Sequence, residues 1–104
     1  MAHEFVEGWT ERIRDQLSDT EGTIDLTLMT VVLLMYDREG AAFTFAGTAG
    51  IDTAATGIVY FDPNAADLQS DLSPYSVRWK VTDVGGKIAF FPNQTPEKWT
   101  VRRP

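Results

Sequence analysis

The chain has 104 residues, a formal net charge of -6 and no cysteine. This length is typical of a single domain, and the lack of cysteine excludes disulfides, thiolate metal sites and cysteine nucleophiles. The excess of negative charge disfavours binding to phosphates, so we expect no nucleic-acid partner.

The first residues, from Met1 to Phe5, do not have the basic region followed by an apolar stretch that is typical of a signal peptide. We therefore expect the protein to be made and retained in a cytoplasm, or released by lysis. The longest apolar run covers residues 30–36 and is far shorter than the roughly 20 residues that span a bilayer, so we expect no membrane association.

Residues 4–19 fit two patterns. Large apolar residues recur at every fourth position, as in an amphipathic helix; they are Phe5, Trp9, Ile13 and Leu17. Ile13, Asp15 and Leu17 also alternate with polar residues, as they would in an edge strand. Local propensity favours the helix, and the pattern by itself leaves both structures open.

Residues 30–36 predict a β-strand, because β-branched residues open an apolar run that ends at a charged, glycine-closed turn. Side chains alternate between the two faces of a strand, and here both faces are apolar. One face carries Val31, Leu33 and Met35, and the other carries Val32, Leu34 and Tyr36. Either another part of this chain or another protein covers the second face.

The middle of the chain predicts shorter elements. We expect a short strand over residues 42–46, paired with the central strand as a hairpin, and a loop or weak edge over residues 47–56. A strand is expected over residues 57–61. After the proline at position 63, residues 65–68 are expected to form one helical turn.

The last third of the chain predicts three strands. Residues 75–81 alternate most regularly, and residues 87–91 return antiparallel to them after a glycine-containing turn at 83–86. A final strand is expected over residues 98–102. Six or seven short strands at intervals of about ten residues indicate an all-β sandwich.

The sequence predicts no catalytic group. His3 is the single histidine and lies in a terminal segment that we expect to be mobile. One histidine without a partner supports no hydrolytic mechanism, and no serine lies in a nucleophile-elbow motif. We therefore expect neither an enzyme nor a bound cofactor.

Four residues in one stretch could supply oxygen ligands for calcium; they are Asp62, Asn64, Asp67 and Asp71. Their spacing lacks the twelve-residue loop and its closing glutamate. Turn and helix-cap roles are favoured for Asp62 and Asp67, so we expect no metal site here.

Core packing accounts for most of the aromatic residues, because alternation directs Tyr75, Trp79 and Trp99 inward. Other apolar residues fall on the opposite faces of their strands or in the N-terminal segment, and an exposed patch of them would mark a protein interface. The candidate interface residues are Phe5, Trp9, Val32, Leu34, Tyr36 and Tyr60, together with one of Phe90 and Phe91. The alternative is that loops or the N-terminal segment cover them.

A series of short motifs also runs through the chain in a recognisable order. They occupy residues 5–8, 19–27, 37–40, 56–60, 65–68, 75–79 and 86–92. In order and spacing they resemble the immunoglobulin-like N-terminal domain of phage baseplate upper proteins, a module that is also found alone in small virion and prophage proteins. Leu28 and Met29 depart from the pattern, because the family usually has a small residue, often glycine, at this point.

The resemblance implies an immunoglobulin-like β-sandwich of about seven strands over residues 11–104, preceded by an N-terminal arm over residues 1–10. It also implies that residues 12–18 form a strand, which decides against the helix. A docking role in a virion follows from it. Receptor recognition does not carry over, because in the baseplate proteins it belongs to a region beyond this domain.

We therefore predict a non-enzymatic structural protein of a tailed-phage virion, made in the cytoplasm of the bacterial host. Its expected partners are other virion proteins of the tail, baseplate or capsid, bound through apolar strand faces, and a symmetric homo-oligomer is expected in the particle. The tail tip or baseplate is slightly favoured over a head–tail junction or a decoration role. The alternative is a carbohydrate-binding β-sandwich module, which requires Tyr60, Trp9 and a neighbouring aromatic residue to form one solvent-facing platform.

Overall fold

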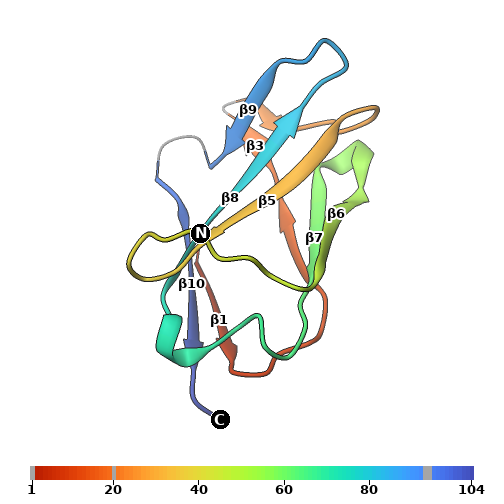
Figure 1. Cartoon of the computed structure of the whole chain (residues 1–104). Coiled ribbons are helices and arrows are strands. Elements are labelled where there is room, and N and C mark those ends of the chain that lie inside the picture. The colour runs from red at the N-terminus through yellow and green to blue at the C-terminus, as the bar shows by residue number, and fades with distance from the viewer. Residues whose placement is uncertain (1, 20, 93–94) are drawn as a thin grey trace.

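The computed structural model describes residues 2–19, 21–92 and 95–104, and the regular structure of this part of the chain is almost entirely β (Figure 1). Two sheets contribute most of the buried residues of one apolar core, and Leu17, Leu26 and Leu68 from the connections complete it. The all-β sandwich predicted from the strand spacing is therefore confirmed. None of the helices in the described residues is both long enough and apolar enough to cross a membrane.

The larger sheet has five strands. In spatial order these are β1 (Ala2–Val6), β10 (Glu97–Arg102), β8 (Tyr75–Thr82) and β5 (Thr30–Tyr36), with β9 (Ile88–Phe91) also paired to β8. β1 runs parallel to β10, whereas the other pairs in this sheet are antiparallel. Strands from the two ends of the chain thus lie side by side.

The smaller sheet has three strands, in the order β2 (Ile13–Gln16), β7 (Ile58–Asp62) and β6 (Thr48–Thr53). The remaining elements are a short ladder of β3 (Ser18–Asp19) with β4 (Gly22–Thr23) and two 3-10 turns, η1 (Ala54–Thr56) and η2 (Ser70–Leu72). The described residues therefore contain more strand segments than the seven predicted, because several of the segments are very short.

Alternation along the strands builds the core. Every second residue of β8, from Tyr75 to Val81, is buried, and the residues between them are half-buried. Trp99 of β10 and Phe61 of β7 stack across the two sheets with their ring centroids 6.0 Å apart. Fully burying one such side chain contributes roughly 1.5–3 kcal/mol, so these contacts supply much of the driving force for folding.

The N-terminal residues differ in part from the expectations. Ile13–Gln16 form β2 and pair with β7, so the strand implied by the resemblance is present and the helix is not. Within residues 1–10, which are expected to form an N-terminal arm, Ala2–Val6 form a strand, because the backbone groups of this segment find hydrogen-bonding partners along β10.

The hairpin expected over residues 42–46 is reduced to one isolated bridge between Tyr36 and Ala42. Phe45 instead turns its ring edge-on against Phe61, with the centroids 4.9 Å apart. In this segment, side-chain packing against the core thus replaces the expected backbone ladder.

Of two further segments, the first agrees with the edge that was expected and the second differs from the expectation. Residues 47–56, expected as a loop or weak edge, contain β6 at the edge of the smaller sheet. Residues 65–68, expected as a helical turn, form a non-helical turn in which the N–H of Asp67 donates to the carbonyl of Asn64. The aspartate side chain holds this turn closed, as described below.

We predict that Gly57→Ala costs about 3 kcal/mol or more in the free energy of unfolding. Gly57 has a φ of 72°, and an added Cβ would lie 2.6 Å from the carbonyl oxygen of Ile24 and 2.9 Å from that of Leu17. Gly86→Ala is the matched control, because Gly86 has a φ of 84° and open space around it, so only the conformational cost of roughly 1–2 kcal/mol applies. Urea denaturation measures both values, and equal losses would contradict the predicted clash.

Candidate functional site

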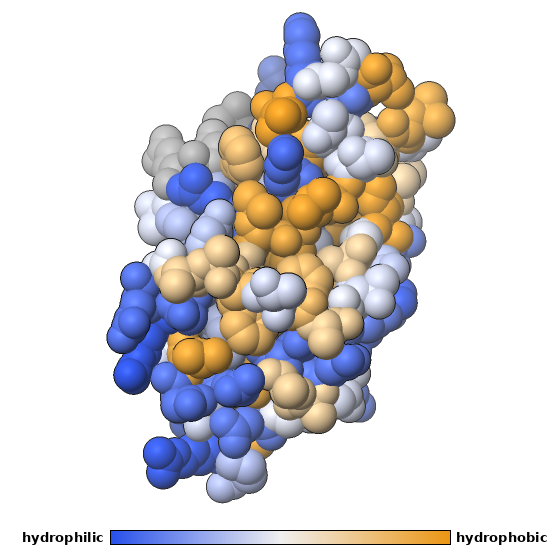
Figure 2. All heavy atoms as spheres, in the orientation of Figure 1, coloured by the Kyte–Doolittle hydropathy of each residue, from blue (hydrophilic) through white to orange (hydrophobic). Residues whose placement is uncertain are grey.

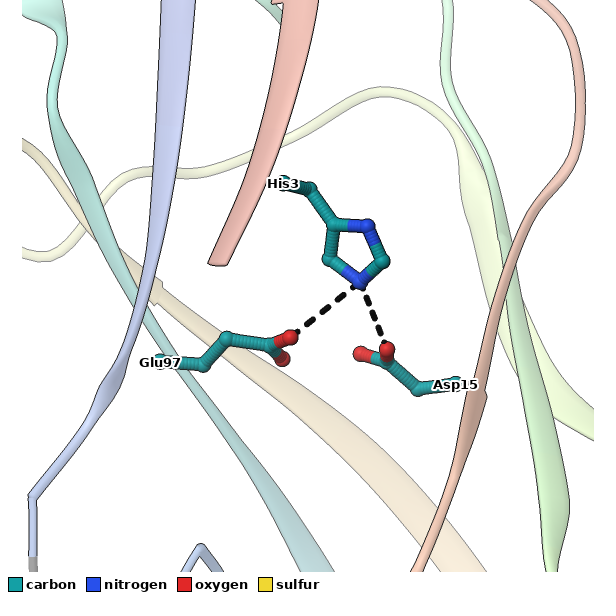
Figure 3. A group of neighbouring side chains, drawn as sticks. All are labelled: His3, Asp15 and Glu97. Carbon is teal, nitrogen blue, oxygen red and sulfur yellow. Dashed lines mark hydrogen bonds and ion pairs between the residues drawn. The ribbon is translucent and has the colours of Figure 1, made fainter. Parts of the chain in front are cut away.

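Three ionisable side chains from different strands converge between the two sheets (Figure 3). Nε2 of His3, from β1, lies 2.7 Å from Oδ1 of Asp15 in β2 and 3.1 Å from Oε1 of Glu97 in β10. Asp15 is 8% exposed and Glu97 is 6% exposed, so both carboxylates are removed from water. We call these three residues the His3 cluster.

The same alternation that builds the core brings the His3 cluster together. In β2, Asp15 lies two residues after the buried Ile13 and shares its face. In β10, Glu97 lies two residues before the buried Trp99. His3 pairs with Trp99 in the ladder of β1 and β10, and its ring lies against the ring of Phe5 at a centroid distance of 5.7 Å. Polar residues thus occupy three positions at which each strand otherwise presents apolar side chains.

The hydrogen bonds of the cluster are unequal. Asp15 accepts one hydrogen bond from His3 and a second, at Oδ2, from the indole N–H of Trp79 at 3.2 Å. Oε1 of Glu97 is buried and has no hydrogen bond among the described residues, although it lies close to His3. Nε2 of an imidazole carries at most one hydrogen, and the shorter distance assigns it to Asp15.

The charges of the cluster shift the pKa values of its members in different directions. The hydrogen bond to Asp15, followed by the close approach of Glu97, raises the pKa of His3 to about 10. Burial opposes ionisation of Asp15, but His3 and Glu97 outweigh it, and the pKa of Asp15 is lowered. Burial, reinforced by the neighbouring Asp15, raises the pKa of Glu97. At neutral pH, Asp15 and His3 therefore form an ion pair beside a carboxyl group that retains its proton more readily.

A pocket of about 250 Å³ opens beside the two carboxylates. Its lining includes Asp15 and Glu97 together with Trp79, Phe91 and Pro92. The carboxylates thus have His3 as one neighbour and the pocket as another. Imidazole nitrogen and carboxylate oxygen are metal ligands as well as acid–base groups, and the ligating atoms of the cluster all lie within 4.8 Å of one another.

Sequence reasoning missed this cluster. His3 was expected to be mobile and without a partner, but β1 holds it against Asp15 and Glu97. The available signal was an acidic residue at an inward position in each of two alternating patterns, Asp15 between Ile13 and Leu17 and Glu97 before Trp99. An inward carboxylate requires a partner, and His3 supplies it.

The candidate interface residues do not form one surface. Phe5 is 7% exposed and belongs to the core, because alternation along β1 turns its ring toward Trp99 and Trp9. Trp9 packs against Phe5 and is half-buried. Tyr60 lies in the smaller sheet, where the guanidinium group of Arg12 covers its ring at 3.9 Å.

The other three candidates, Val32, Leu34 and Tyr36, lie on the outer face of β5. Val32 is 51% exposed, whereas Leu34 and Tyr36 are half-buried. Phe90, rather than Phe91, joins them on this face, since it pairs with the outward Lys80 of β8. The predicted split of β5 into an inner and an outer apolar face is therefore what the structure has.

The aspartates considered as calcium ligands have other partners. Asp67 is buried, and its carboxylate accepts hydrogen bonds from the backbone N–H groups of Ala46, Gly47 and Asn64 at 2.7 to 2.8 Å. Asp62 forms an ion pair with Arg12 at 2.8 Å. These contacts agree with the turn role expected for Asp67.

Comparisons with known proteins do not identify a family for this chain, because no family model and no curated protein matches it. The likeness to phage baseplate domains therefore stays a prediction.

We predict that the ring of His3 titrates with a pKa of about 10 in the folded protein. Because this pKa is raised above the unfolded value of 6.5, the stabilisation that protonation of His3 contributes is fully present below pH 6.5 and is lost as the pH rises through about 10. His3 is the only histidine, so its NMR resonances report this titration directly in chelator-treated protein.

The unfolding free energies of the wild type and of His3→Gln should differ most below pH 6.5 and converge toward pH 10. A titration midpoint of His3 near the unfolded value would contradict the ion pair with Asp15.

Proposed function

We propose that this protein is a non-enzymatic structural component of a tailed-phage particle, built as an immunoglobulin-like sandwich that docks onto other virion proteins. The order of sequence motifs supports the family, and the β-sandwich agrees with the fold that the family would have. The observation that carries the docking role is an exposed apolar surface on one sheet.

The apolar outer face consists of Val32 and Leu34 of β5, Ile88 and Phe90 of β9, and Val84 in the turn that joins β8 to β9. Val84 is 81% exposed, Ile88 is 52% exposed and Phe90 is 39% exposed. Figure 2 shows apolar side chains gathered over these strands. The outward residues of β8, which lies between β5 and β9, are polar, so the apolar side chains lie on either side of Arg78 and Lys80. Exposed apolar side chains rimmed by polar residues mark protein interfaces.

The outer face of the smaller sheet is different in kind. Arg12 and Arg14 form ion pairs with Asp52 and Asp62, and Arg12 also covers Tyr60. A surface whose charges are already paired with one another offers little apolar area to a partner. We therefore assign the docking surface to the larger sheet.

The partners that fit this surface are virion proteins of the tail, baseplate or capsid, repeated around a symmetric ring.

A catalytic role fits less well. Asp15 and Glu97 are a carboxylate pair with shifted pKa values, as acid–base enzymes require. However, Asp15 and Glu97 are only 8% and 6% exposed although they line the pocket, and Asp15 is already held by His3 and Trp79.

The carbohydrate-binding alternative also lacks support. It requires Tyr60 and Trp9 to share one solvent-facing platform. Arg12 covers the ring of Tyr60, and Trp9 packs against Phe5 and donates its indole N–H to the carbonyl of Glu11. These contacts occupy the ring surfaces that a sugar would stack on.

We predict that the double variant Val32→Lys with Phe90→Lys is incorporated into phage particles at least about 10-fold less than the wild type, because two lysines buried in an interface cost more than the 1.4 kcal/mol of a tenfold change. Cells expressing the variant are infected with a phage that lacks the gene, and purified particles are probed with an antibody to the chain. Circular dichroism checks that the variant is folded.

Val6→Lys is the matched control for this experiment. Val6 is an exposed valine on β1 at 47%, outside the apolar outer face, and its replacement should leave incorporation unchanged. Absence of the wild-type chain from purified particles would contradict the virion role. Equal incorporation of both variants would contradict the assigned surface.

A further inference from the structure

We propose that the His3 cluster is a binding site for a divalent transition-metal ion, with Zn²⁺ as the best-fitting ion, which joins the two sheets through His3, Asp15 and Glu97. The inference is independent of the virion role, because it depends only on the interior of the sandwich.

The donor set is the first argument. One imidazole nitrogen and two carboxylate oxygens are the ligand types that zinc takes in sites with three protein ligands. Calcium requires six to eight oxygen ligands, which three side chains with one nitrogen among them do not provide. The donor atoms lie within 4.8 Å of one another, so a single ion can reach all three.

The spacing of the donor atoms is the second argument. Zn–N and Zn–O bonds of about 2.0–2.2 Å at tetrahedral angles separate two ligand atoms by roughly 3.3 Å. In the structure, Nε2 of His3 lies 2.7 Å from Asp15 and 3.1 Å from Glu97. An outward shift of His3 by about half an ångström would therefore admit the ion, and β1, at the edge of its sheet, is the element that can make this shift.

The unmatched oxygen of Glu97 is an independent third argument. Glu97 is 6% exposed, and its Oε1 points into the cluster without a hydrogen bond from the described residues. A buried acceptor that receives no hydrogen bond costs free energy. A metal ion in place of the Nε2 hydrogen of His3 would give Oε1 the direct bond that it lacks and would also add positive charge between the two buried carboxyl groups.

The pocket leaves room for the fourth ligand of the metal ion. Asp15 and Glu97 line it, together with Gln16 and Ser18. Water in this pocket can reach an ion held by the two carboxylates, so a fourth ligand does not have to come from the protein. Three protein ligands and one water molecule complete a tetrahedral zinc site.

We test the proposal by titrating the metal-free protein with ZnCl₂ in an isothermal calorimeter. We expect saturable binding of one Zn²⁺ per chain and a higher thermal unfolding midpoint in its presence, because an ion that binds only the folded state stabilises it. The X-ray absorption spectrum of the loaded protein should show one imidazole and N/O ligands at about 2.0–2.1 Å.

The isosteric variant Glu97→Gln and the variant His3→Gln should each lose at least about 10-fold in affinity, since even residues that only orient a metal ligand contribute 10- to 100-fold. Glu4→Gln is the matched control. It lies beside His3 on β1, but its side chain is exposed and pairs with Arg102. Circular dichroism establishes that each variant retains its strands.

Three results would overturn the site: no saturable Zn²⁺ binding, equal affinity in Glu97→Gln and Glu4→Gln, or a spectrum without imidazole. If a variant does not fold, the spectrum of the loaded wild type decides, because it reports the ligands directly. Failure of this site would leave the apolar outer face, and thus the proposed docking role, unaffected.

Discussion

Aromatic packing between two sheets of unequal width is the interaction on which this fold depends. Trp79 and Trp99 of the larger sheet are fully buried against the smaller sheet, where Phe61 stacks on Trp99. A sheet of three strands cannot cover the whole inner face of a sheet of five. Segments outside the ladders complete the cover, and Phe45 of the connection after β5 reaches Phe61 in this way. β9 remains less covered, since Ala89 is exposed although it pairs with the inward Val81.

The His3 cluster lies within this apolar interior, where burying its charged groups costs free energy. Removing a carboxylate from water costs several kcal/mol, and an ion pair offsets this only when its remaining hydrogen bonds are satisfied. Asp15 meets that condition through His3 and Trp79, whereas Glu97 does not. Core packing would be served equally well by apolar residues at these positions, so packing alone does not account for the cluster. The imbalance at Glu97 makes this part of the interior the place to look for a ligand.

The two outer faces of the sandwich have opposite character. Ion pairs between two arginines and two aspartates lie on the smaller sheet, while the larger sheet carries exposed valine, isoleucine and phenylalanine side chains on β5 and β9 beside the charged residues of β8. The interior site and the exterior surface are therefore separate features. One joins the two sheets inside the protein, and the other is the surface that we propose for docking.

The strands whose alternation is strong could be predicted from the amino-acid sequence alone. β8 and β5 were predicted nearly to the residue, and so was the split of β5 into buried Leu33 and exposed Val32, because period-two patterning is a local property of the chain. Which strands face one another depends on how the whole chain packs. Phe5 lies in the core because β1 pairs with β10, a strand near the opposite end of the sequence. His3, Asp15 and Glu97 met for the same reason: no local pattern encodes a contact between residues so far apart, and two packed sheets create it.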